Sequence, residues 1–271
     1  MSSTLNILRS RRRRRNEPDA RSQERARAAG FGCVFSIGVF LLFLIFSFVI
    51  TYRSITNDLP PADAIEDLLN PRDGQLLQPT RIYARDGETL VQVFAPDNAP
   101  RRYIPLSIEN PQHLPTDLWR ATLALRDPDF WAHPGYSPEE LSNPEIHPTL
   151  TQQLVADLLL WDEPPTLRRA IRERMLAAQL TNLYGRQQIL EWYLNSANFG
   201  HNAYGAESAA QLYFGKSVTE LTTAESATLA AASQSPALNP IDAPVASYQR
   251  RQETLYIMEE LNLLDAEPAD A

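Results

Sequence analysis

The stretch Gln188-Ile-Leu-Glu-Trp-Tyr-Leu-Asn-Ser-Ala-Asn-Phe-Gly200 lies between a helical pattern and a turn. It predicts a short helix over residues 187–194 that ends before the turn at Phe199 and Gly200. We expect Glu191 and Asn195 to hold this turn together. The stretch therefore predicts that the central part of the protein is helical.

Helical patterns continue on both sides of this stretch. Pro148 suits the first turn of a helix, Gly215 suits a helix end, and Thr222 with Glu225 forms a capping box. Apolar stripes are expected at Leu167, Ile171, Leu176, Leu180 and Leu183, and in the last helix at Tyr248, Leu255, Met258 and Leu261. The other expected helices cover residues 113–125, 149–160, 167–183, 203–214, 222–233 and 245–261.

A small β element precedes the helices. Apolar and polar residues alternate on both sides of Asp86-Gly87, which is the pattern of a β-hairpin. Residues 101–106 are a candidate third strand. The fold class predicted from these patterns is mainly α with a small N-terminal β element.

The N-terminal region combines a basic tail with a long uncharged run. Residues 1–27 carry nine arginines against three acidic residues, although the net charge of the chain is −8. Residues 28–52 carry no charge and are long enough to span a bilayer as a helix. A signal peptide would have a shorter apolar region and a cleavage site, and a buried core helix would have less polar flanks. Cys33 is the single cysteine, so disulfides within the chain are excluded.

The charge distribution predicts the orientation of this span. By the positive-inside rule the arginine cluster stays in the cytoplasm, which places the body on the outer face of the plasma membrane. An arginine run can also bind nucleic acid. Next to a membrane span, contact with anionic lipid is the favoured interpretation, and we expect no nucleic-acid partner.

One segment has the composition of an active site. Ala124-Leu-Arg-Asp-Pro-Asp-Phe-Trp-Ala-His-Pro-Gly-Tyr-Ser-Pro138 places acids, a histidine and aromatic residues at the end of an apolar run. Arg126 stands where such a segment would have a base. The segment therefore raises the question of whether the protein performs chemistry.

Three stretches, in this order after the apolar span and the hairpin, closely resemble a known family. They are Thr149-Leu-Thr-Gln-Gln-Leu154, the stretch quoted first, and Tyr204-Gly-Ala-Glu-Ser-Ala-Ala-Gln-Leu-Tyr-Phe-Gly-Lys216. The family is the peptidoglycan glycosyltransferases, glycosyltransferase family 51, found in class A penicillin-binding proteins. The resemblance covers about residues 79–264, and residues 221–240 resemble the closing motif of the family. No transpeptidase pattern follows, so a monofunctional arrangement is expected.

The resemblance implies both a fold and a reaction. The implied fold is a lysozyme-like helical glycosyltransferase domain with a small membrane-dipping lobe, joined to one transmembrane helix. The implied substrate is lipid II, a disaccharide-pentapeptide on a polyprenyl pyrophosphate. A first carboxylate is the general base on the acceptor 4-hydroxyl, and a second carboxylate with basic residues handles the donor pyrophosphate. Besides lipid II and the membrane, cell-wall synthesis proteins are candidate partners; no cofactor is certain, no metal ligands are predicted, and a divalent metal is left open.

Composition and the resemblance together give the expected organisation of the chain. We expect a cytoplasmic arginine-rich tail over residues 1–27, a transmembrane anchor over 28–52 and a stalk over 53–78. The small β element then covers 79–106, the glycosyltransferase-like domain 107–264 and a polar tail 265–271.

The first motif departs from the family at its most demanding position. The family pattern is Glu-Asp-x-x-Phe followed by His-x-Gly, and Asp127, Phe130 and His133 match it. The glutamate position is Arg126. A guanidinium has no acceptor lone pair and stays protonated, so it cannot take a proton from a sugar hydroxyl. General-base help is worth about 10²–10⁴-fold, and the sequence predicts its loss.

The second and third motifs keep part of their pattern. The second retains Thr149, Thr151, Gln152 and Gln153, whereas the family Gly-Ser is His147-Pro148 and the family lysine and asparagine are Ala156 and Asp157. The third retains Arg169 and Glu173, with Ala170 in place of a lysine and with Arg172 and Arg174 keeping the region basic.

The candidate site residues follow from these motifs, with structural alternatives beside them. Arg169 and Glu173 could form a surface pair at i, i+4, Phe130 could belong to the core, and His133 could shape a turn. The carboxylate of another residue could replace the missing base; the candidates are Asp127, Asp129, Glu139 and Glu145. The catalytic positions are Glu173, Arg126 and Asp127, and the substrate-binding positions are Phe130, His133, Thr151, Gln152, Gln153, Arg169, Arg172 and Asn195.

Three hypotheses about function result. The first is a folded, anchored member of the family that has little or no polymerase activity and binds lipid II or protein partners. The second is an active lipid II glycosyltransferase with a rearranged base. The third, a lysozyme-like hydrolase, also needs an acid facing the cleft, and Arg126 removes the natural candidate.

Overall fold

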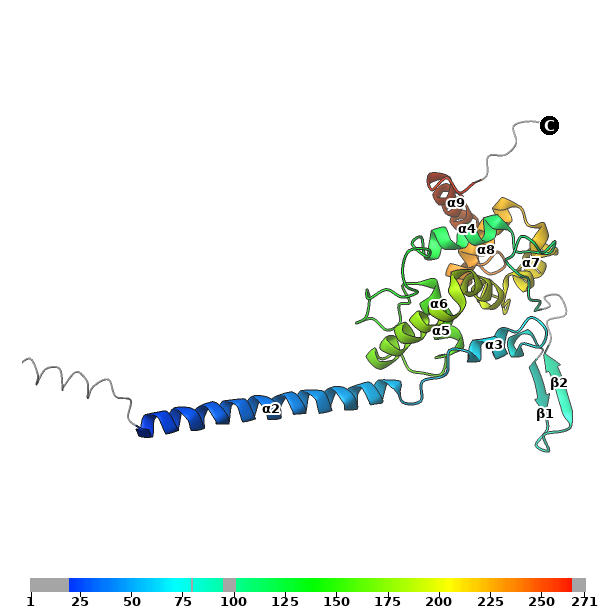
Figure 1. The fold of residues 1–271 in the computed structure, drawn as a ribbon. Helices are drawn as coiled ribbons and strands as arrows, with labels where there is room; N and C mark the ends of the chain where they lie inside the picture. Colours follow the sequence, from blue (N-terminus) through cyan, green and yellow to red (C-terminus); the bar gives the residue numbers. More distant parts are fainter. Residues whose placement is uncertain (1–19, 79, 95–100, 265–271) are drawn as a thin grey trace, which may run out of the picture. The chain divides into compact units, whose positions relative to one another are not determined.

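The computed structural model describes residues 20–78, 80–94 and 101–264. The chain divides into two compact units, with the boundary in the sequence between Asn57 and Asp58. In the first unit, helix α2 (Ala20–Thr56) is drawn as a single long helix in Figure 1. Its segment Phe35–Thr56 has a mean hydropathy of 2.4, so it is long and apolar enough to cross a membrane. The tails expected over 1–27 and 265–271 lie wholly or largely outside the described residues.

The second unit is mostly helical, as predicted. Its order is α3 (Ala64–Leu69), η1 (Gln75–Leu77), β1 (Thr80–Tyr83), β2 (Leu90–Phe94), α4 (Thr116–Arg126), α5 (Leu150–Leu158), α6 (Leu167–Ser196), α7 (Ala206–Phe214), η2 (Val218–Glu220), α8 (Thr223–Gln234), η3 (Pro236–Leu238) and α9 (Pro244–Glu260). The capping box of Thr222 and Glu225 forms at the start of α8 as expected.

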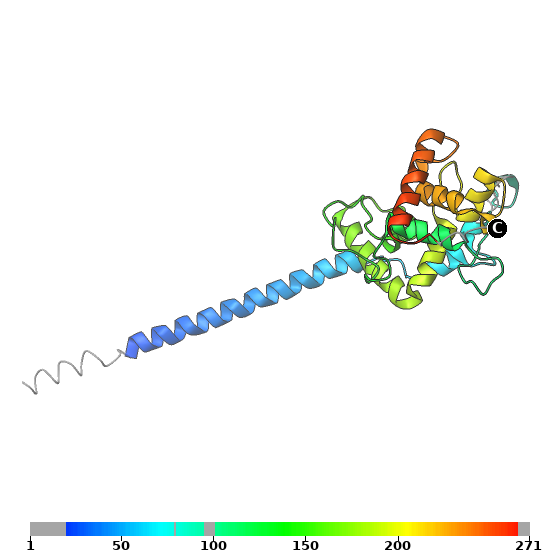
Figure 2. The same ribbon diagram turned by 90° about the horizontal axis from the view of Figure 1, so that it is seen from above.

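Two packed groups of helices build the core of this unit. Helices α4, α8 and α9 lie side by side in Figures 1 and 2, and α5 packs against α6. Leu118 of α4, Leu154 of α5 and Leu176 of α6 are buried in one continuous core. This core holds the ends of α4, α5 and α6 together, which is where the motif residues lie.

The predicted apolar stripes are only partly correct. Met258 is buried, but Tyr248 and Leu261 of the last helical segment are about half exposed, because α9 packs mainly against α4 and α8 on one side. Leu167 and Leu183 are also exposed, the first because it lies in the opening turn of α6 and the second because it lies just before a break in that helix.

The break falls at Gly185. Its backbone has φ 74° and ψ 168°, so two helices meet there within the segment Leu167–Ser196. A positive φ of this kind favours glycine, which has no Cβ to clash. The two helices predicted over 167–183 and 187–194 therefore correspond to the two halves of α6.

The hairpin forms as predicted, but the third strand does not. Strands β1 and β2 pair antiparallel, and Asp86 accepts hydrogen bonds from the backbone N–H groups of Glu88 and Thr89 in the turn. Residues 101–106 remain outside the sheet because side chains of α6 take their backbone groups. The N–H of Ile104 donates to Asn195 Oδ1 (2.8 Å) and that of Leu106 donates to Glu191 Oε2 (2.7 Å).

The segment expected to be a stalk is in part a component of the body. The second unit begins at Asp58, and Ile65 and Leu69 on α3 are fully buried in the main core. Residues at i and i+4 share one face of a helix, so this short amphipathic turn buries its apolar side. The guanidinium of Arg172 fixes the entry of the segment by donating to the carbonyl oxygen of Asp58 (2.7 Å).

Candidate functional site

A polar pocket of about 590 Å³ opens where α4, α5, α6 and α8 end. We call it the main pocket. Its volume lies in the range of sites for small molecules. Its lining is Leu76, Arg101, Arg126, Gln153, Asp157, Leu158, Tyr193, Asn195, Ser196, Ala197, Asn198, Tyr204, Ser233, Gln234 and Pro236.

Arg126 stands at the junction of two pockets. It is the last residue of α4, and it lines both the main pocket and a second pocket of about 500 Å³. The second pocket is formed by residues 126–129, His133, Pro134, residues 136–139, Pro148 and Thr149. Its Nη2 donates to Gln153 Oε1 (2.9 Å), and Gln153 Nε2 donates in turn to both carboxylate oxygens of Asp157 (2.9 Å each). The expected base position therefore presents a guanidinium to the main pocket.

The charges in the main pocket are two arginines and one acid. Arg101 lies 5.1 Å from the ring centroid of Tyr204 and donates to the carbonyl of Leu76. Desolvation raises the pKa of Asp157, although its side chain keeps solvent contact; hydrogen bonding from Gln153 and nearby positive charges oppose the rise. The pocket therefore favours a ligand with negative charge.

The carboxylate of Asp127 stabilises the first motif through hydrogen bonds. Its carboxylate oxygens lie 2.9 and 3.0 Å from His133 Nε2, and Oδ2 accepts the N–H of Leu150 (2.9 Å) at the start of α5. His133 Nδ1 accepts the N–H of Gly135, so the proton is on Nε2 and is donated to Asp127. The pair joins the end of α4 to the start of α5, which is the turn-shaping role considered for His133.

The loop after α4, which carries the first motif, is fixed through its backbone. Arg186 donates to the carbonyl oxygens of Phe130 (3.0 Å) and His133 (2.5 Å). Arg174 donates to those of Ser137 (2.8 Å) and Glu139 (2.6 Å). Gly135 is needed within the loop, because its φ is 93° and a Cβ there would lie 1.9 Å from the Thr181 hydroxyl.

Glu173, the second carboxylate of the pattern, is buried and fully engaged. Its exposed fraction is 1%. Gln152 Nε2 donates to Oε1 (2.7 Å), and His147 Nδ1 lies 2.7 Å from Oε2. His147 is not among the site residues predicted from the sequence; the available signal was a bulky side chain at a position where the family pattern has glycine.

The remaining predicted site residues divide between core and pocket. Gln153 and Asn195 line the main pocket, whereas Phe130, Thr151 and Gln152 are buried. Arg172 is 1% exposed and pairs with Glu163 (2.9 Å), which places it inside the body rather than in either pocket. The surface pair considered for Arg169 and Glu173 does not form, because Glu173 is buried and Arg169 donates to the carbonyl of Ala156 (3.4 Å).

The carboxylates considered as replacement bases are also placed. Asp129 and Glu139 line the second pocket, and Glu145 lines neither of the two pockets. Asp157, which stands where the family pattern has asparagine, is the carboxylate that shares the main pocket with Arg126.

The described residues do not fit a divalent metal at Glu173. Both of its oxygens already have hydrogen-bond partners. Across the described ranges no group of three or more histidine, cysteine, aspartate or glutamate side chains is placed to hold a metal ion. We therefore assign no metal ligands.

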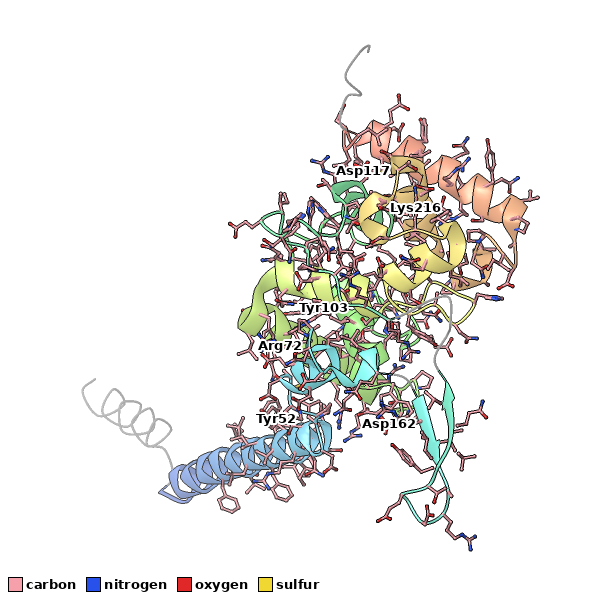
Figure 3. All side chains as sticks on the ribbon, turned by 90° about the vertical axis from the view of Figure 1, so that its right-hand side faces the viewer. Tyr52, Arg72, Tyr103, Asp117, Asp162 and Lys216 are labelled. Carbon is pink, nitrogen blue, oxygen red and sulfur yellow. The ribbon has the colours of Figure 1, made fainter. Side chains whose placement is uncertain are left out.

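Glu191 and Asn195 hold the segment before α4 rather than the turn at Phe199. Tyr103 lies toward the middle of the body in Figure 3, and its hydroxyl donates to Glu191 Oε1 (2.6 Å). Asn195 pairs with both backbone groups of Ile104, through Oδ1 and through Nδ2 (2.9 Å). These bonds set the pocket wall that contains Arg101.

Asn195→Ala is therefore expected to destabilise the body by about 1–3 kcal/mol, because it leaves buried groups of Ile104 without partners. Urea denaturation of the purified protein measures the change. Asn182→Ala is the matched control, since Asn182 lies on the exposed face of the same helix and its change should stay within about 0.5 kcal/mol. Equal losses in the two variants would contradict the assigned role.

The family model and the similar proteins that match this chain point to the same family. The transglycosylase family model matches residues 97–259. Penicillin-binding protein 1A of Vibrio cholerae is 31% identical over 219 residues, which is 76% of this chain and 25% of that protein. The Escherichia coli protein of the same name is 33% identical over 202 residues, 70% of this chain and 22% of that protein. This chain thus spans about a quarter of the length of these relatives.

A solved structure matches as well. The crystal structure of penicillin-binding protein 1A from Haemophilus influenzae is 25% identical, with a TM-score of 0.38, over 70% of this chain and 19% of that one. The family assignment rests on the family model, which matches more than half of the chain. The chain belongs to the transglycosylase family, the glycosyltransferase family 51 domain of class A penicillin-binding proteins.

Proposed function

We propose that this protein is a membrane-anchored member of the family that binds lipid II and polymerises it little or not at all. The observation that carries the proposal is the guanidinium of Arg126 in the main pocket, at the position of the general base. It is bonded to Gln153 and cannot accept the proton of the acceptor hydroxyl. The substrate is proposed from the family alone.

The pocket supports binding of an anionic substrate. Ala156 and Ala170 remove two cations that the family pattern would bring to the donor pyrophosphate. Arg101 and Arg126 supply positive charge from other elements. Guanidinium groups pair well with phosphate oxygens because their planar forks can donate two parallel hydrogen bonds.

The anchor supports the same proposal. The segment Phe35–Thr56 has the length and hydropathy of a membrane span, and the arginine-rich sequence before it favours an N-terminus in the cytoplasm. The body would then face the outer leaflet, where a lipid-linked glycan precursor is displayed. Cell-wall synthesis proteins are candidate partners of a member that holds the precursor without extending it.

A polymerisation assay tests this proposal. Full-length protein in detergent is expected to bind labelled lipid II and to form no glycan chains on a gel. Arg126→Gln serves as the charge control: it removes the cation without creating a base, so binding should weaken while polymerisation stays absent. Glycan chains made by the unsubstituted protein would contradict the proposal.

A second candidate, an active enzyme with a rearranged base, is favoured by one observation. Asp157 lines the same pocket as Arg126, and desolvation raises its pKa toward the range useful to a general base. If this candidate is correct, glycan chains form and Asp157→Asn abolishes them. If chains form and Asp157→Asn leaves the rate unchanged, both functions proposed here fail.

A further inference from the structure

Glu173, the second carboxylate of the family pattern, is covered by its contact with His147. His147 Nδ1 and Glu173 Oε2 are 2.7 Å apart, and the two side chains are 12% and 1% exposed. Gln152 Nε2 donates to the other oxygen, and Gln152 is itself fully buried. Neither of the two pockets that contain Arg126 is lined by Glu173.

We propose that His147 is an inhibitory positioning residue, which keeps Glu173 out of reach of any substrate in the site. The inference rests on the proposed function and deepens it, because it names a second cause of inactivity beside Arg126. It concerns a residue of this chain that the family pattern does not contain.

The hydrogen-bonding needs of a buried carboxylate explain why Glu173 stays paired with His147. A buried carboxylate needs hydrogen-bond donors or a positive charge, since burial without them is costly. His147 and Gln152 supply one donor to each oxygen, so each carboxylate oxygen of Glu173 has a hydrogen-bond partner inside the protein. A short hydrogen bond to a carboxylate is also stronger than one between neutral groups.

The local backbone holds the imidazole in this position. Pro148 follows His147 directly, and a residue before proline is restricted to extended conformations. Thr149 then starts α5 as its N-cap, with its hydroxyl accepting the N–H of Gln152. A glycine at position 147 would leave the volume beside Glu173 Oε2 open.

The arginines on α6 nearest to Glu173 have partners elsewhere in the body. Arg169 is one helical turn away but donates to the carbonyl of Ala156, and Arg174 donates to three carbonyl oxygens. Arg172 pairs with Glu163 and with the carbonyl of Asp58. The contact with His147 is thus the one of the two described side-chain contacts of Glu173 that comes from a residue outside the family pattern.

Carboxyl labelling of the full-length protein in detergent tests the proposal. The protein is treated with a water-soluble carbodiimide and glycine ethyl ester, and labelling rates are read by peptide mass spectrometry. In the unsubstituted protein Glu173 should stay unlabelled while the exposed Glu139 reacts. His147→Gly and His147→Ala should each raise labelling of Glu173 at least tenfold, whereas His147→Gln, which keeps a donor, should raise it much less.

The second histidine–carboxylate pair of the site provides the matched control. His133→Ala should expose Asp127 to the reagent and leave Glu173 protected. The proposal is overturned if Glu173 reacts as fast as Glu139 in the unsubstituted protein, or if His133→Ala labels Glu173 as strongly as His147→Ala does.

It is also overturned if Glu173 stays protected in both His147 variants while their melting midpoints are unchanged. Should His147→Gly fail to fold, His147→Ala and the unsubstituted protein still decide the outcome. Labelling does not depend on polymerisation, so this result is independent of the assay of the proposed function.

Discussion

The double variant Arg126→Glu, His147→Gly is expected to polymerise lipid II about 10²–10⁴-fold faster than the unsubstituted protein. The first change restores an acceptor for the proton of the sugar hydroxyl at the end of α4. The second removes the donor that lies 2.7 Å from Glu173 and frees that carboxylate for the donor side of the site. The measurement is the initial rate of glycan formation from labelled lipid II.

Two variants separate the contributions to this rate. Arg126→Glu alone should gain less than tenfold, because Glu173 stays paired with His147. Arg126→Gln with His147→Gly should stay inactive, because glutamine is not a base. A full gain from Arg126→Glu alone would show that the His147 contact has no effect on the reaction.

Phe130→Ala is expected to lower the free energy of unfolding by about 3–5 kcal/mol, because it removes a fully buried aromatic side chain from the core. Phe130 is 1% exposed, and its ring centroid lies 5.0 Å from that of Trp131 and 6.2 Å from that of His133, in edge-on contacts. The loss therefore includes the packing that positions the first motif. Urea denaturation of the full-length protein measures it.

Trp131→Ala is the matched control for Phe130. Trp131 is the next residue and is 52% exposed, so its removal should cost about 1 kcal/mol or less. If Phe130→Ala leaves stability unchanged and weakens lipid II binding instead, Phe130 contacts the substrate and its assignment to the core is wrong.

The sequence predicts much of this fold because most of the relevant signals are local. The spacing of leucines in α6, the capping box of α8 and the Asp86-Gly87 turn each depend on residues a few positions apart. The third strand expected over 101–106 depends on distant residues. Asn195 and Glu191, about 85–91 positions away, take the backbone groups that a sheet would use.

The site shows the same division between local and distant information. The residue types at Arg126, Ala156 and Ala170 are visible in the sequence, and they predict the missing base and the missing cations. The partners of Glu173 are not visible in the same way. His147 lies 26 positions before it on another segment, and their contact depends on how α5 packs against α6.

The arginines that hold the loop after α4 have a consequence for how such a protein can change over generations. Arg186 and Arg174 hold this loop by donating hydrogen bonds to the carbonyl oxygens of Phe130, His133, Ser137 and Glu139. Every residue has a carbonyl oxygen, so these four hydrogen bonds do not depend on which side chains stand at those positions. The fold and the chemistry can therefore evolve separately. A base at the end of α4 can be replaced by a cation while the scaffold is kept, and selection can then favour binding of a molecule over its conversion.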